Sequence, residues 1–141
     1  MKAVIRISGF VKIAGNVNET LYRMRLRRKY ALVLLPATKE TKSLLDSVRN
    51  FVAFGDIDTD TLTLLLQKRG QLINTKKKTD VAQVVEQLAA GKKSLAEFGF
   101  KPFFRLHPPR GGIDARLHFG VKKGVLGDNK EKINDLIRRM L

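Results

Sequence analysis

The stretch FFRLHPPRGGI, residues 103–113, gathers side chains that could do chemistry. His107 could act as a general base, whereas Arg105 and Arg110 on either side of it could bind an anion. The two adjacent prolines stiffen the backbone, and the two glycines that follow Arg110 permit a sharp bend. The stretch is therefore either a catalytic loop built around a histidine or a shaped segment that presents positive charge.

A catalytic or metal site would need partners for the histidines, and the sequence offers few. His107 and His118 have only Asp114 as a nearby carboxylate, and the chain contains no cysteine. Zinc needs three or four ligands at recognisable spacing. The glycine motifs that cradle phosphates and the G-x-S-x-G nucleophile motif do not occur in the sequence. We therefore predict no catalytic residue, no metal site and no cofactor, and keep an RNA-modifying enzyme that uses His107 as an alternative.

The segment DIDTDT, residues 56–61, resembles a calcium loop because aspartates occupy alternate positions. Such a loop needs glycine at its sixth position and a bidentate glutamate at its twelfth. Those positions hold Thr61 and Gln67. The segment is instead typical of a strand end followed by a helix that Asp60 or Thr59 caps.

Charge is the strongest feature of the composition. The 141 residues include 28 Lys and Arg against 13 Asp and Glu, a net charge of +15. Residues 1–50 carry eleven basic and three acidic side chains, residues 51–100 seven and six, and residues 101–141 ten and four. Because both ends are electropositive and the middle is balanced, the pattern predicts that the ends bind a polyanion.

The compartment follows from the same composition. The chain has no cysteine and no apolar run of membrane-spanning length. Apolar and polar residues alternate at its N-terminus, which is typical of a strand and not of a signal peptide. We expect an intracellular protein that meets neither a membrane nor a small-molecule substrate.

The densest basic run is RMRLRRK, residues 23–29, at the end of a predicted helix and in the turn after it. A solvated helix end that complements its own dipole would explain one or two of these charges. The side chains point in several directions, and the arginine fork matches phosphate geometry. The run therefore predicts contacts with phosphates through Arg23, Arg25, Arg27, Arg28 and Lys29.

The clustering of positive charge also decides between the catalytic and the charge-presenting interpretation of residues 103–113. Lys101, Arg116, Lys122 and Lys123 lie near this stretch in the sequence. Clustered positive charge favours a phosphate-contacting loop, in which Arg105 and His107 project to the same side of a strand. The few aromatic residues look like core, so we expect recognition of the backbone and shape of folded RNA rather than base stacking along a single strand.

The expected elements form an α/β (α+β) protein. Strands at 2–8, 30–35 and 51–57 alternate with helices from about 17, with Asn16 and Glu19 as a capping box, and at 39–49, where Leu44, Leu45 and Val48 are expected to be buried. Two further helices contain residues 62–66 and 81–88. Residues 102–107 are expected to pair antiparallel with 117–120 as a hairpin, before a C-terminal helix at 129–140 with a buried stripe of Ile133, Leu136, Ile137 and Met140.

These residues resemble a known family. The segment RLRRKYALVLLPATKETKSLLDSVRNFVAFGDID is similar to the core of the large-subunit ribosomal protein family called L-thirty. The segments LLLQKRG, PFFRLHPPRGGI and KEKINDLIRRM resemble its longer archaeal form, which corresponds to the eukaryotic L-seven family. The resemblance covers essentially the whole chain.

The resemblance implies a cytoplasmic structural constituent of the large ribosomal subunit, with neighbouring ribosomal proteins and 5S RNA nearby. It implies a ferredoxin-like β-α-β-α-β unit at 1–58 and a packed extension at 59–141 with helices, a basic hairpin and a C-terminal helix. The string GVKKGVLGDNK departs from the family pattern around residues 120–129. Carried over by motif, or added from the basic patches, the expected RNA contacts are Gly9, Lys12, Arg23, Arg25, Arg27, Arg28, Lys29, Lys68, Arg69, Arg105, His107, Arg110, Arg116, Lys122 and Lys123.

A second alternative is a nucleic-acid-binding protein outside the ribosome, such as a DNA-compacting protein. Such a protein would bind generic duplex DNA as well as ribosomal RNA, and the sequence lacks wedge residues beside a minor-groove arm. Competition between the two nucleic acids separates the interpretations.

Overall fold

The structure is a computed structural model that describes residues 1–9, 11–73, 80–90 and 95–141. Its first part follows the predicted order of strands and helices, which is therefore confirmed. The elements of this part are β1 (Lys2–Arg6), α1 (Gly15–Arg23), β2 (Ala31–Leu35), α2 (Lys39–Val48) and β3 (Val52–Asp56). The elements that follow are α3 (Thr59–Arg69), α4 (Val81–Ala89), η1 (Leu95–Phe98), β4 (Phe104–Arg105), β5 (Asp114–His118), β6 (Gly124–Asp128), η2 (Lys130–Lys132) and α5 (Ile133–Met140).

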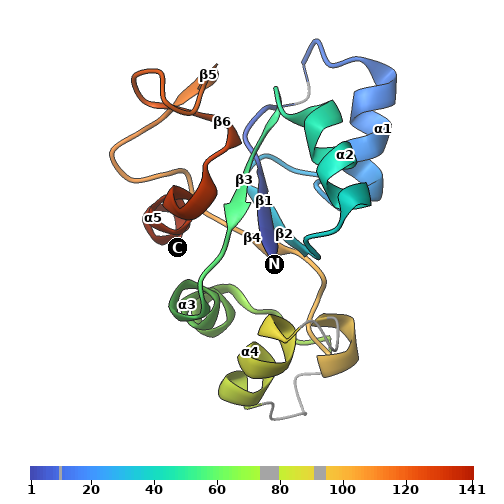
Figure 1. Cartoon of the computed structure of the whole chain (residues 1–141), viewed down its shortest axis with the longest axis vertical. Coiled ribbons are helices and arrows are strands. Elements are labelled where there is room, and N and C mark those ends of the chain that lie inside the picture. The colour runs from blue at the N-terminus through green and yellow to red at the C-terminus, as the bar shows by residue number, and fades with distance from the viewer. Residues whose placement is uncertain (10, 74–79, 91–94) are drawn as a thin grey trace.

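The strands form one mixed sheet in the order β4-β2-β1-β3-β6-β5. The central strand β1 is antiparallel to both β2 and β3, and β6 joins β3 in parallel. Strands from the first 58 residues and from the remainder thus share one sheet (Figure 1). The mixed α/β class is confirmed, and the division at residue 58 stays a prediction.

Helices cover both faces of this sheet. Successive strand residues point to opposite sides, and apolar residues of β1 on each side pack against a different set of helices. On one face, Val4 packs with the buried residues of α1 and α2. On the other, Ala3, Ile5 and Ile7 pack with α3, α4 and α5. Figure 1 shows α1 and α2 on one side of the strands and α5 on the other. In the described part of the chain, no helix is both long and apolar enough to cross a membrane.

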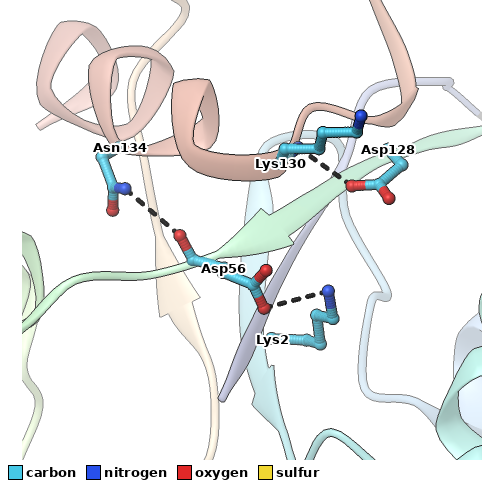
Figure 2. A network of polar contacts seen from close by, with 5 residues as sticks. All are labelled: Lys2, Asp56, Asp128, Lys130 and Asn134. Carbon is cyan, nitrogen blue, oxygen red and sulfur yellow. Dashed lines mark hydrogen bonds and ion pairs between the residues drawn. The ribbon is translucent and has the colours of Figure 1, made fainter.

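The C-terminal helix packs directly on the end of β3. Asn134, which is 8% exposed, donates its side-chain amide to the carbonyl of Asp56 at 3.2 Å and accepts from the amide of Asp58 at 3.0 Å. Figure 2 shows this contact beside the ion pair between Asp56 and Lys2. The close approach of the C-terminal segment to β3 needs glycine at position 55, where a Cβ would lie 2.3 Å from the Lys130 carbonyl oxygen. The predicted buried stripe of this helix is confirmed, since all four of its residues are buried.

Two helix starts differ from the predictions. Helix α1 begins at Gly15 with Ala14 as its N-cap, and the side chain of Asn16 accepts from the next amide instead of capping the helix. Helix α3 begins at Thr59, and its N-cap is Asp58 rather than Thr59 or Asp60, because the Asp58 side chain accepts from the Thr61 amide at 2.7 Å. In both cases several adjacent residues could cap a helix, and the backbone entering the helix decides which one does.

Two packing predictions were also wrong. Leu44 is 44% exposed, although Leu45 and Val48 are buried as expected. The predicted hairpin does not form, because β4 pairs antiparallel with β2 and β5 pairs in parallel with β6. Strand β2 would otherwise leave an open edge, and pairing with β4 covers it while burying Phe104.

Candidate nucleic-acid interface

A buried arginine holds two loops of the candidate interface together. Arg6 is 1% exposed, and its guanidinium donates to the carbonyls of Leu26 at 2.7 Å, Ser8 at 3.0 Å and Gly9 at 3.0 Å. Burial lowers the pKa of Arg6 from its ordinary value, but an arginine keeps its proton in a protein. The loop after β1 and the turn after α1 are therefore fixed relative to each other by one side chain.

The turn after α1 is a Schellman motif with an arginine where glycine is usual. The Leu26 amide donates to the Leu21 carbonyl at 2.9 Å, and the Arg25 amide to the Tyr22 carbonyl at 3.0 Å. Arg25 lies in the left-handed region with φ of 66°. A residue with a side chain in this region lowers the free energy of unfolding by roughly 1–2 kcal/mol relative to glycine. The arginine at this position therefore presents a guanidinium at a cost in stability.

Strand pairing brings Arg105 to the same place. In the β2–β4 ladder, Arg105 lies opposite Ala31, directly after the basic turn. The result is a cavity of about 380 Å³, which we call the arginine pocket. Its lining residues are Arg25, Arg27, Arg28, Ala31, Pro102, Phe103 and Arg105.

Aromatic rings support several of these cations. The Arg27 guanidinium lies 4.3 Å from the centre of the Tyr22 ring, and that of Arg105 lies 5.5 Å from the centre of the Phe103 ring. Such contacts orient the cation without removing its charge. No acidic residue from the described part of the chain lines the arginine pocket, so its positive charge is available to an external anion.

A second basic group, which we call the C-terminal basic cluster, surrounds a cavity of about 330 Å³ between the β5–β6 turn and α5. Arg139 donates from Nε to the Arg110 carbonyl at 2.7 Å and from Nη2 to the Gly112 carbonyl, so α5 holds the loop after the two prolines in place. Asp135 also lines this cavity and offsets part of its charge. The cationic members of the cluster are Lys122, Lys123, Lys132 and Arg139.

The predicted contacts thus divide into groups that the fold brings together and residues that it leaves apart. Six of them line the two cavities: Arg25, Arg27, Arg28 and Arg105 the first, and Lys122 and Lys123 the second. The loop of Arg110 is held beside the second cavity by Arg139. Arg23 is paired with Glu19 at 2.7 Å on the exposed side of α1. Lys68 and Arg69 end α3 and line neither cavity.

The remaining predicted residues lie around these groups. The Gly9 carbonyl accepts a hydrogen bond from Arg6, and Lys12 is exposed in the following loop. The Lys29 ammonium lies 5.1 Å from the Tyr30 ring centre. The side chain of His107 is exposed, and its backbone amide donates to the Met140 carbonyl at 2.9 Å. The side chain of Arg116 falls outside the part of the chain that the structure describes.

Backbone strain coincides with the basic residues. Among the residues that the structure describes, the non-glycine positions with positive φ are Lys12, Arg25, Tyr30, Lys122 and Lys130, and three of these are predicted RNA contacts. Few residues other than glycine adopt this region, and those that do gather at functional sites. The strain therefore supports the choice of these loops as an interface.

Sequence reasoning missed four residues of the candidate interface. Arg6 was not among the expected contacts, although a single arginine among apolar strand residues could have indicated a buried clamp. Phe103 was assigned to the core, and it also lines the arginine pocket. Lys132 and Arg139 belong to the C-terminal basic cluster only because α5 packs beside the β5–β6 turn, and no local pattern signals that contact.

The Arg25→Gly variant is expected to be more stable but to bind RNA more weakly. Relief of the left-handed strain should raise the free energy of unfolding by about 1 kcal/mol, and loss of one phosphate contact should weaken binding about tenfold at low salt. Urea unfolding and RNA titration measure the two effects. Arg25→Ala is the control, since it removes the charge but keeps the strain. Equal stability of the two variants would contradict the interpretation.

Comparison with known proteins provides the remaining evidence. No family model matches the chain. The large ribosomal subunit protein uL30 of Methanococcus maripaludis is 36% identical over 154 residues, which covers 99% of this chain and 98% of the relative. The proteins of the same name from Archaeoglobus fulgidus and Nanoarchaeum equitans are 37% and 35% identical, and the alignments cover 99% of this chain and 99% and 97% of those relatives.

Proposed function

The chain belongs to the uL30 family of large ribosomal subunit proteins, and from this membership we propose that it is a structural constituent of the large ribosomal subunit in the cytoplasm. It binds large-subunit ribosomal RNA and acts without catalysis. The observation that carries the RNA contact is the arginine pocket, where two basic segments far apart in the sequence meet.

Binding proceeds by neutralisation of phosphates on two surfaces. The first surface is the arginine pocket together with Lys12 and Lys29, which come from the two loops that Arg6 links. The second surface is the C-terminal basic cluster with Arg110. Arginine suits this role because its planar fork makes paired hydrogen bonds to phosphate oxygens. The sheet and the two apolar cores keep the surfaces in a fixed relation, so the protein holds neighbouring RNA segments in one geometry.

The finer assignments extend the same proposal. The segment 1–58 forms the ribosomal core unit, and residues 59–141 form an extension packed on it. Other ribosomal proteins are its neighbours, and 5S RNA lies near the bound chain. The family resemblance of the motifs KRG, PFFRLHPPRGG and INDLIRRM supports these assignments.

A competition experiment tests the proposed function. The chain is bound to labelled large-subunit ribosomal RNA from Methanococcus maripaludis and competed with unlabelled large-subunit RNA, small-subunit RNA or duplex DNA. We expect large-subunit RNA to compete at least about a thousandfold better than duplex DNA, the usual margin between specific and non-specific sites. Equal competition by DNA would identify a general nucleic-acid-binding protein instead.

A second measurement separates the structural role from catalysis. The His107→Ala variant should lose at most one RNA contact and keep its preference for large-subunit RNA, and neither protein should cleave or modify it. RNA turnover that disappears in the variant while binding persists would favour the enzyme alternative. Photochemical crosslinking from positions 105 and 110 then reports which RNA segments lie beside the two surfaces.

A further inference from the structure

We propose that the arginine pocket seats one extruded nucleotide of the bound RNA, with its base stacked on the guanidinium of Arg105. The inference rests on the proposed function and goes beyond phosphate contact to the kind of RNA feature that the pocket recognises.

The composition of the pocket points to a nucleotide rather than to phosphate alone. A phosphate group needs cationic donors, which Arg25, Arg27 and Arg28 supply. The remaining lining includes Ala31, Pro102 and Phe103, whose side chains have no hydrogen-bond donor for a phosphate. A charged wall beside an apolar wall matches a nucleotide, which carries an anion at one end and a flat base at the other.

The geometry of β4 supplies the stacking surface. The Arg105 guanidinium lies over the Phe103 ring, 5.5 Å from its centre, and the backbone of Arg105 is held by the ladder with Ala31. In the proposed complex, the ring supports the guanidinium from one side and the base stacks on it from the other. Bases in single-stranded RNA stack on aromatic rings and on guanidinium planes in this way.

Size and rigidity select an extruded nucleotide. The cavity of about 380 Å³ is in the range of small-molecule sites, roughly 300–1,000 Å³. A paired base lies inside its helix and cannot enter such a cavity, whereas a splayed base can. The Arg6 hydrogen bonds and the Schellman motif hold the basic turn in place before binding, so little ordering entropy is lost.

The full-length chain can be tested with mononucleotides by following the backbone amide signals of Ala31, Phe103 and Arg25 by NMR. We expect AMP to shift these signals saturably. Ribose 5-phosphate, which has the same phosphate but no base, should bind about tenfold more weakly, because stacking supplies an affinity of that order. Equal affinity for the two compounds, or AMP shifts spread over all basic loops, would overturn the proposal.

Two conservative variants localise the stacking contribution. Arg105→Lys keeps the charge but removes the plane, and Phe103→Leu keeps the apolar contact but removes the ring. Each should reduce AMP affinity severalfold and leave the affinity for ribose 5-phosphate unchanged. The matched control is Arg49→Lys at the exposed end of α2, which should alter neither. If Arg105→Lys binds AMP as tightly as the unaltered chain, the base does not stack there and the proposal fails.

The outcome is separable from that of the proposed function. If the unaltered chain binds AMP no more tightly than ribose 5-phosphate but still prefers large-subunit RNA, the nucleotide pocket alone is rejected. Selective binding of AMP by a chain that does not prefer large-subunit RNA would support the pocket and reject the ribosomal role.

Discussion

Arg6→Ala is expected to lower the free energy of unfolding by about 4 kcal/mol, because three carbonyls lose a charged donor and a cavity replaces the side chain. Arg6 is 1% exposed, and its bonds to Ser8, Gly9 and Leu26 tie the β1–α1 loop to the turn after α1. Urea unfolding followed by circular dichroism measures the loss.

Two further variants separate stability from the positioning of the interface. Lys2→Ala removes a surface ion pair with Asp56, 2.9 Å long, and should cost under about 1 kcal/mol. Arg6→Lys keeps the buried charge, but a single ammonium cannot reach three carbonyls that surround a guanidinium. It should stay folded and yet bind large-subunit RNA several times more weakly, since the two loops are no longer held together. An Arg6→Ala protein that unfolds at the same urea concentration as the unaltered chain would show that the clamp contributes little.

The affinity for large-subunit RNA is expected to fall about a thousandfold between roughly 50 and 200 mM salt, as for a protein that makes about six phosphate contacts. Each neutralised phosphate releases condensed counterions, and added salt opposes that release. Filter binding across a salt series measures the slope of log affinity against log salt.

A pair of triple variants locates the contacts behind that slope. Alanine at Arg25, Arg28 and Arg105 removes three cations from the arginine pocket and should reduce the slope by about two to three. Alanine at Lys39, Lys42 and Arg49 removes the same charge from the exposed side of α2 and should leave the slope nearly unchanged. Equal slopes for the two variants would mean that net charge, rather than the arginine pocket, governs binding.

The sequence by itself determined the order of the first five elements, the three later α-helices and the concentration of charge, but it did not indicate β6. Strands such as β2 and helices such as α5 are specified by the period of their apolar residues, and this period depends only on neighbouring positions. The basic run at 23–29 and the stretch at 103–113 were visible as candidate anion sites for the same reason.

The tertiary structure alone decided how those sites combine. The pairing of β4 with β2 carries Arg105 to Arg25 and Arg28, although about 80 positions separate them along the chain. Whether Arg6 faces solvent or clamps two loops depends on the helix that covers its side of the sheet. Strand edges and helix faces admit several partners, and local periodicity does not rank them. Only the packing of the whole chain selects one arrangement, and with it the shape of the arginine pocket.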